Sequence, residues 1–168
     1  APRATYRLQL QGNFTLRQAL ELVPYLSALG VSHIYAPPLL KARPGSTHGY
    51  DGCDPAQINP EVGTEADLEA LIAALRAHGM GLVLDIVPNH MGVGGPENPW
   101  WWDVLRYGRA SRFADHFDID WSPADPRLHG KLLVPVLGDD YERVLERGEL
   151  KLVFENAEVS VRYFERRF

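Results

Sequence analysis

Residues 81–90 read Gly81-Leu-Val-Leu-Asp85-Ile-Val-Pro-Asn89-His90, and this stretch says most about how the chain folds. An apolar run that ends in an acid, an amide and an imidazole is typical of a buried parallel strand. Apolar side chains fill both faces of such a strand, and polar ones follow where its carboxyl end surfaces. We therefore predict a strand over 81–87 whose C-terminal end opens into a site containing Asp85, Asn89 and His90.

Two further strands and a helix precede this stretch. Residues 5–10 alternate in polarity and residues 31–36 are mostly apolar, so both are predicted as strands. Between them Thr15 is a candidate N-cap, because Gln18 follows at the spacing of a capping box. Gly30 is predicted to end the helix, since glycine is favoured just past a helix C-terminus.

A second helix is predicted from Thr64, with Asp67 in the capping-box position, to Gly79. Pro24 lies inside the first helix and predicts a kink or a split there. Residues 37–63 are rich in Gly, Pro, Asp and Asn, and we predict a long loop over them. Loops of this length in compact domains are usually functional or disordered.

The order strand, helix, strand, helix, strand predicts an α/β fold with parallel strands and right-handed crossovers. It fits either a doubly wound sheet or the opening third of a (β/α)8 barrel. The periodicity weakens after His90, so residues 91–168 are predicted to form a separate, irregular module inserted after the third strand. Within it we predict strands at 134–137, 150–154 and 159–164 and a helical turn at 139–146.

The composition argues against several classes of function. The formal net charge is −5 and the basic residues are scattered among acids, which argues against a nucleic-acid partner. No window approaches 18 uninterrupted apolar residues, so no membrane-spanning segment is expected. The chain begins directly with a strand pattern, so no signal peptide is expected, and its one cysteine, Cys53, allows no internal disulfide. We expect a cytoplasmic protein that uses no cofactor.

Two polar motifs resemble the α-amylase superfamily, glycoside hydrolase family 13. One is Asp85-x-Val-x-Asn89-His90, and the other is His48-Gly-Tyr50. The resemblance implies that His90 hydrogen-bonds the sugar at the cleavage subsite, that Asp85 orders the site, and that Tyr50 stacks on the same ring. Such contacts suit a flattened, oxocarbenium-like transition state. The resemblance also selects the TIM barrel: residues 1–90 would supply its first three strands and two helices, followed by the inserted subdomain at 91–168.

Further segments are similar to one subfamily, the malto-oligosyltrehalose synthases. They are Asn98-Pro-Trp-Trp-Trp102-Asp-Val-Leu105, Ser111-Arg-Phe-Ala114, Phe117-Asp-Ile-Asp-Trp121, Leu133-Val-Pro-Val-Leu-Gly-Asp139 and Val161-Arg-Tyr-Phe-Glu-Arg-Arg-Phe168. This resemblance implies intramolecular transglucosylation, in which the reducing-end α-1,4 linkage of a maltooligosaccharide becomes an α,α-1,1 linkage. Trp102 is then predicted to contact sugar, and the Trp-rich insert to wall the site against water.

The catalytic carboxylates are not expected in this chain. In the family they follow the fourth, fifth and seventh strands, and nothing after His90 resembles the nucleophile's Gly-x-Arg-x-Asp motif. The chain is therefore predicted to be the N-terminal portion of a longer enzyme whose remaining barrel completes the fold. Its open strand edges would favour aggregation.

Several alternatives stay open. The chain could belong to an α-amylase-like hydrolase, or be a catalytically inactive fragment that binds α-glucan; a doubly wound nucleotide enzyme is remote, because no Gly-x-Gly-x-x-Gly follows the first strand. Tyr50 and the tryptophans could be structural, and His48 could cap a loop. Asn89 matches a calcium position of many amylases, but the other oxygen ligands are not apparent, so no metal site is predicted.

Overall fold

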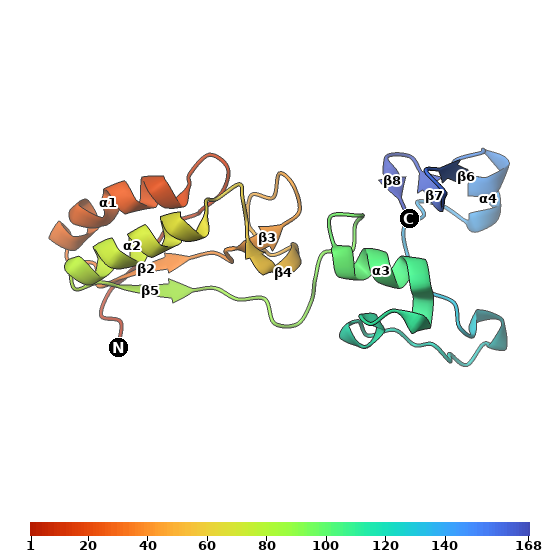
Figure 1. Cartoon of the computed structure of the whole chain (residues 1–168), viewed down its shortest axis with the longest axis horizontal. Coiled ribbons are helices and arrows are strands. Elements are labelled where there is room, and N and C mark those ends of the chain that lie inside the picture. Colours follow the sequence, from red (N-terminus) through yellow and green to blue (C-terminus); the bar gives the residue numbers. More distant parts are fainter. The chain divides into compact units, whose positions relative to one another are not determined.

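The computed structural model describes residues 1–168, and the chain divides into two compact units, Ala1–Gly92 and Val93–Phe168. Figure 1 shows the elements of each unit. No helix in the chain combines the length and the apolar character needed to cross a membrane.

The Ala1–Gly92 unit contains a three-stranded parallel sheet with the order β1-β2-β5. The strands are β1 (Thr5–Arg7), β2 (His33–Ala36) and β5 (Gly81–Leu84). Two helices, α1 (Leu16–Ala28) and α2 (Glu65–Ala77), form the crossovers and pack against each other along one side of the strands (Figure 1). The predicted parallel α/β order is confirmed.

One apolar cluster lies between the helices and the sheet. Leu16, Val23 and Leu26 of α1, Leu71 of α2 and Ile34 of β2 are almost fully buried in it. Burying a side chain of this size contributes about 1.5–3 kcal/mol relative to leaving it exposed. The core therefore holds the three strands in register and fixes where their carboxyl ends emerge.

Both helices begin at the predicted caps. The Thr64 side chain accepts a hydrogen bond from the Asp67 backbone N–H at 3.2 Å, and Asp67 accepts one in return from the Thr64 N–H at 2.9 Å. The Thr15 N–H donates to the Gln18 side chain at 2.8 Å. Of the two outcomes predicted at Pro24, a kink or a split, the split is wrong, because α1 runs through Pro24 as one helix. Pro24 is exposed to solvent, and the buried side chains on the opposite face of α1 stabilise the helix through packing.

The predicted long loop at 37–63 is wrong in part. It contains an antiparallel hairpin of β3 (Leu40–Ala42) and β4 (Gly52–Ile58) with an irregular register. Pro55 and the polar residues of β4 hide the alternation that would have revealed a strand. Cys53 is buried within β4. The predicted first and third strands are also shorter than expected, ending at Arg7 and Leu84.

The Val93–Phe168 unit is built from one longer helix, short turns and a small antiparallel sheet. Val134–Leu137 was predicted as a strand and is not one, because this apolar segment has no strand beside it. The segments predicted at 150–154 and 159–164, and the helical turn at 139–146, are confirmed. The elements are α3 (Pro99–Tyr107), the 3-10 turns Gly108–Ala110, Ala114–His116 and Pro126–Leu128, α4 (Tyr141–Glu146), β6 (Leu150–Glu155), β7 (Glu158–Tyr163) and β8 (Arg166–Arg167).

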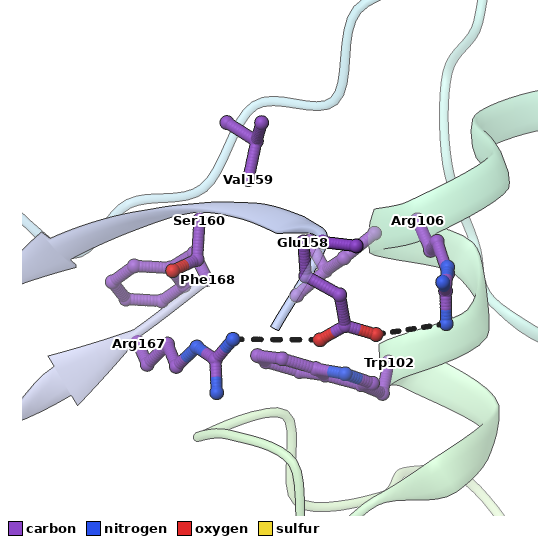
Figure 2. A pocket seen from close by; sticks show the side chains of 9 residues that line it. Trp102, Arg106, Glu158, Val159, Ser160, Arg167 and Phe168 are labelled. Atoms are coloured by element: carbon purple, nitrogen blue, oxygen red, sulfur yellow. Dashed lines mark hydrogen bonds and ion pairs between the residues drawn. The ribbon is translucent and has the colours of Figure 1, made fainter. Parts of the chain in front are cut away.

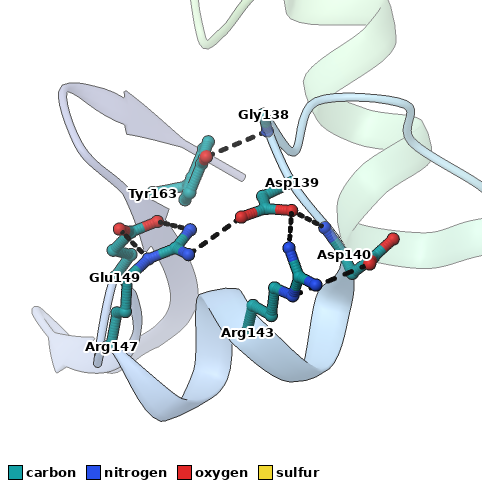
Figure 3. Close-up of polar contacts among 7 residues, drawn as sticks. All are labelled: Gly138, Asp139, Asp140, Arg143, Arg147, Glu149 and Tyr163. Atoms are coloured by element: carbon teal, nitrogen blue, oxygen red, sulfur yellow. Dashed lines mark hydrogen bonds and ion pairs between the residues drawn. The ribbon is translucent and has the colours of Figure 1, made fainter.

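Ion pairs join the elements of this unit. Arg106 of α3 lies 3.0 Å from Glu158 of β7 (Figure 2). Arg147, just after α4, pairs with Asp139 at 2.9 Å and with Glu149 at 2.6 Å (Figure 3). The charged side chains thus tie the helices to the sheet, where the apolar core is small.

Candidate functional site

Asp85 follows β5 directly, and its Oδ2 atom receives hydrogen bonds from three directions. Tyr50 donates its hydroxyl hydrogen to this oxygen, Tyr35 of β2 donates from 3.0 Å, and Arg7 of β1 lies at 3.5 Å. The Arg7 guanidinium carbon also lies 4.5 Å from the centre of the Tyr35 ring. Because β1, β2 and β5 are parallel neighbours, their carboxyl ends bring these residues to one edge of the sheet.

These contacts fix the charge of the carboxylate. The hydrogen bond from Tyr50 is the main cause that lowers the pKa of Asp85, and those from Tyr35 and Arg7 add to it. In return, the hydrogen bond to Asp85 raises the pKa of Tyr35, and Tyr50 is the main cause that raises the pKa of Arg7. The site therefore holds a carboxylate whose ionised form is stabilised by the hydrogen bonds that it accepts.

The His48-Gly-Tyr50 loop presents two stacked rings. The ring centres of His48 and Tyr50 lie 5.9 Å apart with 23° between the planes, and the Tyr50 N–H donates to His48 Nδ1 at 3.0 Å. Gly49 adopts φ +78°, and a Cβ there would lie 2.7 Å from the Pro38 carbonyl oxygen. Only glycine meets both conditions, so the backbone at Gly49 sets how the two rings project.

His90 connects this loop to the segment after β5. Its Nε2 donates to the Tyr50 carbonyl oxygen at 2.9 Å, and its Nδ1 lies 2.9 Å from the side-chain oxygen of Asn89. The His90 ring is exposed. The structure therefore brings five of the predicted residues into one cluster, which we call the Asp85 cluster: His48, Tyr50, Asp85, Asn89 and His90.

Sequence reasoning missed three residues that hold this cluster. Arg7 and Tyr35 contact Asp85 from the neighbouring strands, and Gln9 donates to the Thr47 carbonyl at 3.0 Å, next to the His48 loop. One signal was present in the sequence: the first strand also ends in polar residues, as the third does. That signal could not show which residue Arg7 contacts, because Asp85 lies 78 positions away in the sequence.

A largely apolar cavity of about 330 Å³ adjoins the cluster. Asp85 and His90 line it together with side chains from the hairpin and the segment after β5, including Leu40, Ile58 and Ile86. Pockets with apolar walls and a few convergent polar groups are the usual form of small-molecule sites. No group of three or more His, Cys, Asp or Glu side chains in the chain is placed to hold a metal ion.

Trp102 belongs to the Val93–Phe168 unit, and the three adjacent tryptophans differ in environment. Trp100 stacks on Phe113 with ring centres 5.0 Å apart. Trp101 is buried and packs at 5.1 Å against Phe117. Trp102 is half-buried and lines a separate cavity (Figure 2). Trp101 lines a third cavity but is only 6% exposed, so Trp102 is the more accessible of the two tryptophans that line cavities.

Comparison with known proteins gives a consistent set of relatives. The family model described as "Alpha amylase, catalytic domain" matches residues 12–142. A putative maltooligosyl trehalose synthase of Mycobacterium tuberculosis is 51% identical over 143 residues, which are 82% of this chain and 18% of that protein. An intracellular maltogenic amylase of Bacillus subtilis is 34% identical over 146 residues, 86% of this chain and 22% of that protein.

Solved structures agree. The maltooligosyltrehalose synthase of Arthrobacter ramosus shares 43% identity with a TM-score of 0.85, covering 99% of this chain and 21% of the other. The chain thus spans about a fifth of the length of these relatives. The sequence match and the parallel strand–helix order agree with the fold of their catalytic domain. The chain is homologous to malto-oligosyltrehalose synthases and belongs to the α-amylase family.

Proposed function

We propose that this chain supplies part of the sugar-binding site of a malto-oligosyltrehalose synthase. The observation that carries the proposal is the convergence of Tyr50, His90 and an ionised Asp85 at the carboxyl edge of the parallel sheet. In barrels of this kind, that edge is where substrates bind. The ligand we propose is the reducing end of an α-1,4-linked glucan.

The geometry divides the work of binding between the rings and the polar atoms. The exposed face of Tyr50, backed by His48, offers a flat surface for the apolar face of a pyranose. All three donors to Asp85 use Oδ2, so Oδ1 stays available to accept a hydrogen bond from a sugar hydroxyl. Arg7 and Tyr35 then act as positioning residues, because they hold the carboxylate without needing to touch the sugar.

The reaction we propose is intramolecular transglucosylation. A carboxylate nucleophile forms a glycosyl-enzyme intermediate, and the released glucose re-attacks through its anomeric hydroxyl to give the α,α-1,1 linkage. We assign neither the nucleophile nor the acid/base to this chain. The part we assign to the Asp85 cluster is to hold the sugar ring in a flattened geometry while its linkage changes.

An α-amylase-like hydrolase is the alternative, and the similarity to the Bacillus subtilis amylase favours it as second choice. The greater identity to the synthase and the match over nearly the whole chain favour the synthase. The two enzymes differ in the fate of the released sugar, which either re-attacks or gives way to water.

The natural enzyme containing this chain, incubated with maltopentaose, separates the two. A synthase makes reducing ends disappear with little release of glucose, whereas a hydrolase makes them increase. Tyr50→Phe and Tyr50→Ala in the same protein test the cluster. Phe keeps the ring and loses the hydrogen bond to Asp85, whereas Ala loses both, so Ala should weaken maltopentaose binding more. Equal binding by the Ala variant would show that the Tyr50 ring does not hold the sugar.

A further inference from the structure

The Val93–Phe168 unit has a cavity of about 290 Å³ between α3 and the β7–β8 strands. Its walls are of two kinds, as Figure 2 shows. Trp102, Leu105 and Phe168 provide apolar surface, and Glu158, Ser160 and Arg167 provide polar atoms. We call this the Trp102 cavity. Its volume is near the lower end of the range for ligand sites, which suits a single ring.

Two polar atoms of this cavity's lining residues are buried without a hydrogen-bond partner. They are the Ser160 hydroxyl and the Arg167 Nε–H. Ser160 is only 4% exposed. Leaving such a group unpaired is unfavourable for folding, and native proteins rarely do it without a reason such as a missing water or ligand. A ligand hydroxyl group could satisfy both. Its oxygen would accept a hydrogen bond from the Arg167 Nε–H, and a hydroxyl of the ligand would donate to, or accept from, the Ser160 hydroxyl.

The charge pattern argues against an ionic ligand. The Glu158 carboxylate lies between two guanidinium groups, at 3.0 Å from Arg106 and 3.4 Å from Arg167. The site therefore already contains the anion that its arginines attract, and a second anion would face Glu158. A neutral hydroxyl can instead donate to Glu158, whose position the two arginines hold (Figure 2).

The aromatic wall completes the argument. The guanidinium carbon of Arg167 lies over the Trp102 ring, 5.7 Å from its centre, so the donor faces one side of the indole. A flat apolar surface next to fixed donors and acceptors matches a pyranose, which carries C–H groups on its faces and hydroxyls at its edge. We propose that the Trp102 cavity is a binding site for one pyranose ring of a neutral glycan. Choosing an α-1,4-glucan as the probe rests on the proposed function.

The experiment is an NMR titration with maltotriose of the natural enzyme that contains this chain, isotope-labelled at its tryptophan, serine, tyrosine and histidine residues. We expect shifts at the Trp102 indole N–H and at the Ser160 amide, in addition to shifts at Tyr50 and His90. Ser160→Ala should weaken binding in the Trp102 cavity about threefold to tenfold, the loss expected for one hydrogen bond. The same change should leave the unfolding midpoint unchanged or raise it, because it removes a buried hydroxyl that has no partner. Ser122→Ala, at an exposed serine outside the cavity, is the matched control and should change neither quantity.

The possible results separate this inference from the proposed function. Shifts at Tyr50 and His90 without shifts at Trp102 and Ser160 would overturn the inference alone. Shifts at Trp102 and Ser160 alone would support it and count against the sugar role of the Asp85 cluster. No shifts anywhere would overturn both. Unchanged affinity in Ser160→Ala, or equal shifts with inorganic phosphate in place of maltotriose, would also overturn the inference. Trp102→Phe, which keeps an aromatic surface, should retain more affinity than Trp102→Ala.

Discussion

In the Ala1–Gly92 unit one continuous apolar cluster joins both helices to the sheet, and the polar side chains gather at the sheet's carboxyl edge. In the Val93–Phe168 unit the buried apolar side chains are few, and stacked rings and ion pairs connect the elements. The three buried side-chain atoms without a partner all belong to this second unit: Trp101 Nε1, Ser160 Oγ and Arg167 Nε.

If both proposed sites bind sugar, this difference represents two ways of building such a site. At Asp85 the protein's own donors satisfy one oxygen, Oδ2, and hold the carboxylate in place, so the site is ordered before any ligand arrives. In the Trp102 cavity the Ser160 hydroxyl and the Arg167 Nε–H have no hydrogen-bond partner in the protein, so a bound ligand would supply those hydrogen bonds. Groups that the protein holds in place before binding suit a reaction that needs fixed geometry, whereas polar groups without a partner favour ligand binding.

The largest effect is expected from a mutation that leaves a cavity in the apolar cluster of the Ala1–Gly92 unit. Leu71→Ala should destabilise the Ala1–Gly92 unit by about 2–5 kcal/mol, because Leu71 is almost fully buried among α1 and sheet side chains. Hydrogen exchange, read separately for each unit, measures the effect. Val144→Ala in the second unit is the matched change and should have a smaller effect, confined to that unit. If Leu71→Ala weakens protection equally in both units, they fold as one body and the comparison fails.

A stabilising change comes next. Pro24→Ala should raise the stability of the first unit by about 1–2 kcal/mol, because it restores a backbone N–H in the middle of α1. The gain is reduced because alanine also frees the unfolded chain. Urea unfolding of the variant checks this, with Glu21→Ala on the same helix as the control. A lower midpoint for Pro24→Ala would mean that the proline ring makes contacts that outweigh the missing hydrogen bond.

A pH effect of smaller size is expected at the start of α2. Hydrogen bonds from Thr64, followed by Arg17, lower the pKa of Asp67 to about 2. Because the folded-state pKa lies below the ordinary value of 3.8, the stabilisation is complete above about pH 4 and is lost as the pH falls towards 2. An NMR titration of the Asp67 carboxylate measures this pKa directly. Asp67→Asn should flatten the stability profile between about pH 4 and pH 2, and an unchanged profile would contradict the assignment.

The smallest effect concerns the charges of the second unit. Arg147 pairs with Asp139 and Glu149 and is partly exposed, so added salt should screen these pairs and slightly destabilise the Val93–Phe168 unit (Figure 3). The Ala1–Gly92 unit should respond less, because it depends on apolar burial. Arg147→Met should remove most of the difference in salt response. If both units respond to salt alike, the ion pairs are not what distinguishes them.

Sequence patterns predicted the first unit well because there periodicity and burial coincide. The caps at Thr15 and Thr64 marked both helix starts, and Gly30 and Gly79 follow shortly after the two helices end. The β3–β4 hairpin was missed because the two strands pair with each other in an irregular register and their polar residues do not alternate with apolar ones. The end of β5 at Leu84 depends on how far β2 extends beside it.

The second unit shows where local patterns stop. Asn98 accepts hydrogen bonds from the N–H groups of Trp100 and Trp101, and Pro99 follows it, which is a strong helix-start signal. The three adjacent tryptophans lie inside this helix, α3, and hide its helical periodicity in the sequence. The candidate site was predicted for five of its residues, which lie in two short motifs. Arg7 and Tyr35 could not be predicted, because only the folded sheet brings them to Asp85.

Two glycines with positive φ carry different consequences for the evolution of this chain. Gly30 has open space around it, so a population of variants selected for sugar binding should accept Asn or Asp there, residues that tolerate this conformation. Gly49 faces the Pro38 carbonyl, and the same population should stay uniform at that position. Diversity in a selected library would thus be permitted at the end of α1 and forbidden between His48 and Tyr50. Codon 49 would record selection for the proposed sugar site even where every neighbouring surface position drifts.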